Sequence, residues 1–205
     1  MKKVIYNFIL LILITFISLT IILSTTGIKT KRFNNLIAKK INHLNNSINL
    51  KLTTIKFKLD LKELSLFLEA IDPKIYYQNS VIPAKNIKAY IDFISLVKSN
   101  PKLKKINLIL SQFDVEQLKK ISSNFKPSNF TSFINNRIKQ GKLNIELEVF
   151  LDDKNLFDNF IARGSVLNLE TEIKNNINLQ KTNFNFFADK NDILITNIVG
   201  ESGPI

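Results

Sequence analysis

Few residues of this sequence have the types and spacing that catalysis or metal binding requires. Asp152 and Asp153, and the pair Asp189 and Asp192, come closest to a carboxylate cluster, and both pairs lie in stretches that read as hairpin turns. Asp is favoured in turns because its side chain hydrogen-bonds to the local backbone, so we interpret these residues as turn residues. His43 is the only histidine. The chain has no cysteine, which excludes disulfides and thiolate metal sites.

Other signatures of enzymes are also missing. The sequence has no phosphate-binding glycine-rich loop, no nucleophile-elbow motif and no zinc-protease motif, and it contains only five glycines. We therefore predict a protein that is not an enzyme, with no catalytic residues, no metal and no cofactor. The formal net charge is +12. Because no nucleic-acid-binding motif accompanies it, we expect no nucleic-acid partner, and we attribute the lysines to base-composition bias or to contact with anionic lipid headgroups.

The strongest signal is an apolar run over residues 4–23, directly after Lys2 and Lys3. A helix of this length, rising about 1.5 Å per residue, is about 30 Å long and matches the hydrocarbon core of a bilayer. A signal peptide has a shorter apolar region and a small-residue cleavage site, which residues 23–27 match poorly. We predict residues 1–27 to be a retained transmembrane anchor, with a cleaved signal as the alternative.

The lysines around the anchor give conflicting indications of its orientation. Lys2 and Lys3 favour a cytoplasmic N-terminus, whereas Lys29, Lys31 and Arg32 lie within the window of the positive-inside rule on the other side. When the basic residues on both sides of the anchor are counted, the positive-inside rule favours the opposite orientation. We expect the N-terminus in the cytoplasm and the body outside it, mainly because of the family resemblance described below.

Beyond the anchor, apolar and polar residues alternate in several stretches separated by turn residues, which is typical of half-buried strands. This predicts a mainly β fold with a few short helices, in which a single N-terminal transmembrane helix is followed by an antiparallel, groove-like sheet. We divide the body into three parts: residues 28–121, an amphipathic helix and a first β segment; residues 122–140, an irregular linker; and residues 141–205, a second β segment that we expect to continue beyond this sequence.

Three helices are expected in the body. Residues 30–44 have apolar positions at helical spacing and Thr30 as a suitable N-cap. This helix either packs on its own domain or lies among the headgroups beside the anchor. Residues 93–98 and 115–121 are expected to form shorter helical segments.

The apolar positions of the strands share one face, which is the candidate functional surface. It is either the buried side of a sheet, covered by helices or a second sheet, or an open groove that receives acyl chains. The small number of helices favours the open groove. The candidate lining residues are Ile55, Phe57, Leu59, Leu61, Ile106, Leu108, Leu110, Leu143, Ile145, Leu147 and Val149.

The order of these parts resembles the N-terminal region of the AsmA-like family, the group of AsmA, TamB and YhdP. The resemblance rests on the anchor, the basic helix over residues 31–44, the strand IKFKLDLKELSLFLEA, the stretch 84–92 leading into FISLVK, and KKINLIL leading into Asp114 and Val115. It covers essentially the whole chain. Its motifs are hydrophobic patterning and segment order, without a catalytic signature.

The resemblance implies a single-pass protein of the inner membrane, with a cytoplasmic N-terminus and a periplasmic β-groove. Such a groove contributes to phospholipid transport between inner and outer membranes or to outer-membrane assembly, needs no cofactor, and has the acyl chains of membrane phospholipids and other envelope proteins as partners. Family members are usually longer, so this chain would hold only the anchor and the first rungs. The alternative is a membrane-tethered, closed β-sandwich that binds or supports another envelope protein.

Overall fold

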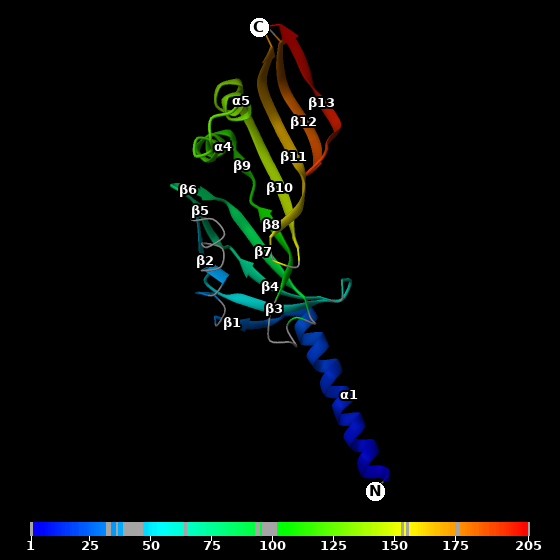
Figure 1. Cartoon of the computed structure of the whole chain (residues 1–205). Coiled ribbons are helices and arrows are strands. Elements are labelled where there is room, and N and C mark those ends of the chain that lie inside the picture. The colour runs from blue at the N-terminus through cyan, green and yellow to red at the C-terminus, as the bar shows by residue number, and fades with distance from the viewer. Residues whose placement is uncertain are drawn as a thin grey trace.

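A computed structural model of the chain describes residues 2–31, 34–35, 37–38, 47–63, 65–92, 95, 102–152, 154, 156–174 and 177–204. The fold is mainly antiparallel β-sheet with one long N-terminal helix (Figure 1), as predicted. The elements are α1 (Lys2–Thr25), β1 (Ile28–Thr30), β2 (Ile48–Lys51), β3 (Ile55–Asp60), β4 (Ser65–Ile71), β5 (Lys74–Tyr77), β6 (Ser80–Ile82), β7 (Ala84–Ile91), β8 (Leu103–Leu110), β9 (Phe113–Asp114), α4 (Val115–Ser122), α5 (Asn129–Arg137), β10 (Ile138–Leu151), β11 (Phe157–Lys174), β12 (Ile177–Asp189) and β13 (Ile193–Pro204).

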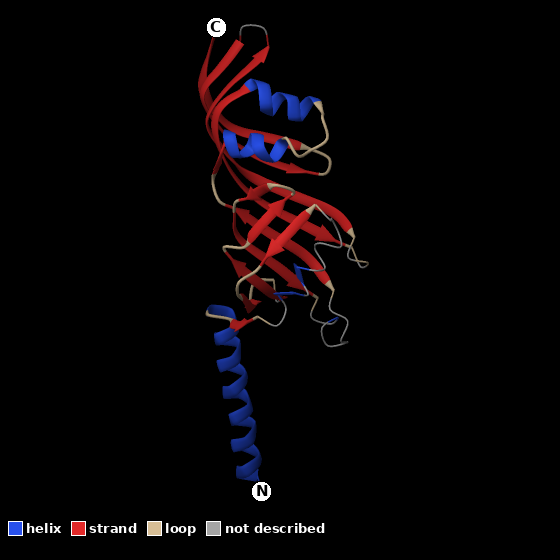
Figure 2. Ribbon diagram, turned by 90° about the vertical axis from the view of Figure 1, so that its left-hand side faces the viewer, coloured by secondary structure: helices blue, strands red, loops and turns tan. Residues whose placement is uncertain are grey.

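Helix α1 projects away from the rest of the molecule (Figures 1 and 2) and is long and apolar enough to cross a membrane. Its threonine hydroxyls donate to backbone carbonyls one turn back, Thr15 to Leu11 at 2.8 Å and Thr20 to Phe16 at 2.9 Å. These hydrogen bonds satisfy polar groups that hydrocarbon would leave unpaired. The predicted anchor is therefore a continuous helix whose few polar side chains are compatible with a bilayer.

One open sheet forms most of the body, in the order β1-β3-β4-β7-β8-β10-β11-β12-β13, with β9 paired to β10 at one end. Every neighbouring pair of strands in this sheet is antiparallel. The connections from β1 to β3, from β4 to β7 and from β8 to β10 contain other elements. Strand β8 pairs directly with β10, so the two β segments expected on either side of a linker belong to the same sheet. Residues 157–174 of the expected second β segment form one long strand, β11.

The stretch 122–140, which we expected to be an irregular linker, contains helix α5 and the beginning of β10. Ser128 caps α5 by accepting a hydrogen bond from the Thr131 N–H, and the Thr131 hydroxyl accepts one from the Ser128 N–H. Helix α4, which matches the prediction for residues 115–121, has the same reciprocal cap between Asp114 and Gln117. Such capping boxes satisfy backbone donors that the first turn leaves free.

Only part of the amphipathic helix expected over residues 30–44 lies within the described residues. Residues 34–35 and 37–38 are helical, whereas Thr30, the expected N-cap, belongs to β1 and pairs with Ile55. His43 and most of the expected segment 93–98 lie outside the described residues.

The core cluster lies on one face of β3, β4 and β7. Two residues outside this sheet, Ile37 and Leu52, pack against it, so here the face is covered. A small second sheet, in the order β2-β5-β6, contributes the buried residues Leu50 and Ile75. The buried members of the core cluster are Ile55, Leu68, Ala70, Ala89 and Ile91.

Candidate functional site

The register of the sheet aligns the apolar positions into rows that cross it from edge to edge. One row runs through Leu108 on β8, Leu147 on β10 and Ala162 on β11, and then through Ala188 and Ile193 on the last two strands. Directly paired residues point to the same face of an antiparallel sheet. The sequence alternation of separate strands therefore becomes one continuous apolar face.

The predicted lining residues fall on three strands of this face, with one exception. The residues of β8 and β10 face each other directly, as in the pairs Leu108 with Leu147 and Ile106 with Val149. Those of β3 lie farther along the same face, beyond β7 and β4. Leu61 lies in the turn after β3 with 54% of its surface exposed, so it is not part of the sheet face.

Coverage of the face changes along the sheet. Near α1 the face is closed, and Ile55 retains only 1% exposure beneath the core cluster, so this predicted lining residue has no access to a ligand. At the far end of β10, the side chains of Val115 on α4 and Leu169 on β11 converge beside Gly141. Figure 2 shows α4 and α5 on one side of the long strands.

Between these two ends, the face is only partly covered. Leu108, Leu147 and Phe186 are half-buried, in contrast to the buried Ile55 of the core cluster. We call this middle section of the apolar face the open section. Its members are Ile106, Leu108, Leu143, Ile145, Leu147, Val149, Gly164, Phe184 and Phe186.

Gly164 allows an aromatic side chain to lie flat in the open section. It pairs with Ile145 on one side and Phe186 on the other. A Cβ at this position would lie 2.9 Å from the Phe186 Cζ atom and 2.0 Å from the Asn144 carbonyl oxygen. The position therefore requires glycine because neighbouring atoms fill the space that a side chain would need. Gly164 and Phe186 carry no local sequence signal for a site, although Phe184 and Phe186 alternate in the sequence.

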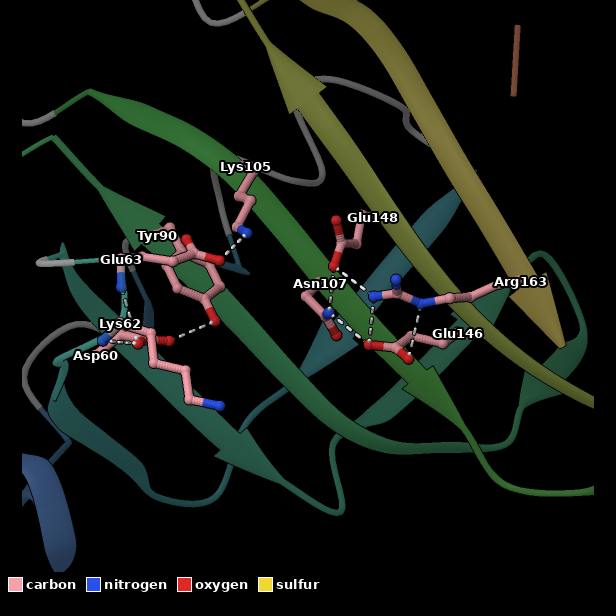
Figure 3. Close-up of polar contacts among 9 residues, drawn as sticks. All are labelled: Asp60, Lys62, Glu63, Tyr90, Lys105, Asn107, Glu146, Glu148 and Arg163. Carbon is pink, nitrogen blue, oxygen red and sulfur yellow. Dashed lines mark hydrogen bonds and ion pairs between the residues drawn. The ribbon is translucent and has the colours of Figure 1, made fainter. Parts of the chain in front are cut away.

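The opposite face of the sheet is polar, and ion pairs join several of its charges (Figure 3). Asn107 donates to Glu146 at 2.8 Å, and Arg163 contacts both Glu146 at 3.2 Å and Glu148 at 2.8 Å. The hydrogen bond from Asn107, together with Arg163, outweighs burial and holds the pKa of Glu146 below its usual value. A hollow of about 510 Å³ at β8–β12 is lined by residues of both faces, including Glu146 and Ile145, so it is not confined to the apolar face.

Nearer to α1, lysine side chains cover aromatic rings on this polar face. The Lys105 amino group lies 4.5 Å from the centre of the Tyr90 ring and 2.6 Å from Glu63 Oε1 (Figure 3). Tyr90 stacks on Phe67 with ring centres 5.2 Å apart. Burial, followed by the charge of Asp60, raises the pKa of Tyr90 to about 12. Long lysine stems shield apolar surface while the amino group stays near water, so Lys105 helps to bury the Tyr90 ring.

Comparison with protein-family models, curated proteins and solved structures finds no match to this chain. Among the described residues, no group of three or more His, Asp or Glu side chains is placed to hold a metal ion.

The last strand, β13, continues the apolar face to the edge of the sheet and is strongly exposed. β13 has a neighbour, β12, on one side only, and its other backbone edge is unpaired within the described residues. Ile193 is 74% exposed and Ile195 is 47% exposed, and Leu194, Ile198 and Val199 are exposed as well. An unpaired edge with apolar side chains is a ready template for an additional strand.

Proposed function

We propose that the protein is a membrane-anchored component of the cell envelope whose open section receives phospholipid acyl chains. The observation that carries this proposal is the continuous apolar face, covered near α1 and at its far end but only partly covered between them. Partly exposed apolar surface of this extent is typical of binding sites. An acyl chain is a suitable occupant because the open section offers apolar side chains and the protein carries its own membrane helix.

The cellular setting of this proposal comes from the family resemblance. An AsmA-like protein has its helix in the inner membrane, its N-terminus in the cytoplasm and its body in the periplasm. There the open section would contribute to phospholipid transport between inner and outer membranes or to outer-membrane assembly. The polar face, with its ion pairs around Glu146 and Arg163, is suited to contact water while the apolar face holds lipid.

The absence of cysteine makes a direct test possible, because a single introduced thiol is the only one in the chain. A bimane fluorophore on Leu147→Cys would report from the open section, and one on Glu148→Cys from the opposite face. Vesicles of phosphatidylcholine carrying a spin label on the acyl chain should quench the first probe more than the second. Equal quenching of both probes would contradict acyl-chain entry.

A second candidate function is a tethered module that binds another envelope protein. The observation that favours it is the exposed apolar edge of β13, which suits pairing with a strand from a partner. A photoreactive amino acid at Leu194, an exposed residue of β13 on the face opposite the open section, tests this function. A defined protein adduct from Leu194, together with no lipid contact at Leu147, would favour this function over lipid binding.

A further inference from the structure

The connection between α1 and the sheet fixes the position of one sheet edge relative to the membrane. Only Thr26 and Gly27 separate α1 from β1. The Gly27 N–H donates to the Ile22 carbonyl at 2.8 Å, which ends the helix, and its φ of +70° turns the chain into β1. A Cβ on Gly27 would lie 2.6 Å from Lys58 Cγ and 2.9 Å from the Phe57 carbonyl oxygen, so the turn is packed tightly against β3.

This geometry places β1 and β3 at the depth of the lipid headgroups. Each headgroup region is about 5–8 Å thick outside the hydrocarbon core. Lys29 is two residues beyond Gly27, which corresponds to about 7 Å along an extended strand. Figure 1 shows β1 and β3 running across the C-terminal end of α1 instead of away from it. The edge of the sheet at β1 and β3 therefore stays close to the surface of the membrane that holds α1.

The two strands place a pair of like charges at this edge. Lys29 on β1 lies directly opposite Lys56 on β3, an arrangement that destabilises a sheet when nothing compensates the charges. Lys29 is exposed and Lys56 is half-buried, and Lys31 is exposed just beyond β1. Within the described residues, none of these three lysines has an ion-pair partner.

The nearest carboxylate is already occupied. Glu69 on β4 is the direct cross-strand neighbour of Lys56, yet its carboxylate binds the Lys58 amino group at 2.9 Å and accepts a hydrogen bond from Asn86 Nδ2 at 2.9 Å. Burial raises the pKa of Glu69, but these contacts outweigh it and lower the pKa, so the carboxylate stays ionised on Lys58. The like-charge pair of Lys29 and Lys56 therefore retains its excess positive charge.

We propose that Lys29 and Lys56, with Lys31, form a binding site for the phosphate of an anionic phospholipid headgroup in the membrane that holds α1. The charge complementarity is direct, because the uncompensated lysines lie at headgroup depth beside the emerging helix. Headgroup binding would relieve the repulsion between the two lysines and orient the sheet on the bilayer. This site is separate from the open section and takes the headgroup, not the acyl chain.

The test uses the full chain reconstituted in vesicles that contain a trace of photoreactive phospholipid. One set of vesicles is an equal mixture of phosphatidylcholine and phosphatidylglycerol with a photoreactive phosphatidylglycerol, and the other has the corresponding photoreactive phosphatidylcholine. Peptide mapping then measures labelling near residues 28–31 and 55–58. We expect stronger labelling by phosphatidylglycerol, and an approximately tenfold loss of that preference in Lys29→Gln/Lys56→Gln, because each lysine near an anionic surface contributes measurable attraction.

Two control variants separate the site from general charge and from folding. Lys139→Gln/Lys142→Gln removes the same charge from exposed positions at the start of β10, directly after α5, and should retain the preference. Figure 1 shows α5 far from α1. Lys29→Arg/Lys56→Arg keeps the charge and should retain it as well. Equal labelling by both lipids, or an unchanged preference in the glutamine variant, would overturn the proposal. Neither outcome bears on the bimane test of the open section, so the two proposals can fail independently.

Discussion

The backbone N–H of Asn168 on β11 donates a hydrogen bond to the side-chain oxygen Oδ1 of Asn183 on β12, with the two atoms 2.9 Å apart. Asn168 has a φ of 50°, and similar values occur at Lys181 on β12 and Asn197 on β13. Register shifts lie beside these residues in the β11–β12 pair and in the β12–β13 pair. A bulge bends a strand and increases its twist, so this row of bulges bends three neighbouring strands together.

The left-handed backbone at Asn168 gives a stability prediction. A β-branched residue is strained at positive φ, by about 1–2 kcal/mol, whereas glycine is not. Asn168→Val should lower the free energy of unfolding by about that amount, and Asn168→Gly should leave it nearly unchanged. Urea unfolding of the full chain in detergent measures both. Asn185→Val, at an exposed position on β12 without positive φ, is the control, and equal losses at 168 and 185 would contradict a strained bulge.

Gly164 provides a second prediction, on packing in the open section. Gly164→Ala places a methyl group in contact with the Asn144 carbonyl and the Phe186 ring. Overpacking of this kind costs about 1–3 kcal/mol, so the urea midpoint should fall clearly. Gly203→Ala is the matched control, because a Cβ there has no atom within 4 Å. A Gly164→Ala protein as stable as Gly203→Ala would show that β10 and β12 do not approach Gly164 as described.

The polar face predicts a dependence of stability on pH. The pKa of Glu146 is lowered from 4.5 in the folded chain, first by the hydrogen bond from Asn107 and then by Arg163, against the effect of burial. A carboxyl group with a depressed folded pKa stabilises the fold above its unfolded pKa, and this stabilisation is lost as the pH falls through the folded value. Stability should therefore decline below about pH 4.5.

The variant Asn107→Ala isolates this effect. Without its donor, the pKa of Glu146 should move upward toward 4.5, which carbon-13 NMR of the labelled carboxyl group can follow in a pH titration. Asn144→Ala on the same strand as Glu146 is the control, because Asn144 donates to Ser165 and not to a carboxylate. An identical Glu146 titration in the wild type and in Asn107→Ala would contradict the role of Asn107.

Much of the fold could be predicted because the relevant signals are local. The unbroken apolar run gives α1, and period-two alternation gives strands such as β8 and β10. Helix α5 was missed because its residues, NFTSFINNR, include many asparagines and have no clear apolar period, and asparagine has a low helix propensity. Its only sequence signal is the capping box between Ser128 and Thr131. This signal was not used in the prediction of an irregular linker over residues 122–140.

The other features of the fold and the site depend on which elements pack together, and the sequence of a single strand does not determine this. Ile55 and Leu147 have the same alternation, yet Ile55 belongs to the core cluster that Ile37 and Leu52 pack against, while Leu147 is only half-buried. Coverage depends on which segment packs above each part of the sheet. The bulge at Lys181 likewise has no local signal, because lysine has no special preference for positive φ.

The central claim, that acyl chains enter the open section, is tested most directly by site-specific photo-crosslinking in living cells. A photoreactive amino acid at Ile145 or Leu147 should form phospholipid adducts, detected by mass spectrometry of the purified chain. The same group at Ile55, beneath the core, or at Glu148, on the opposite face, should form few. Phospholipid adducts confined to Ile145 and Leu147 are the predicted result. Adducts with protein neighbours alone, together with solvent exclusion at both positions, would show that the face is a closed core and would contradict the account.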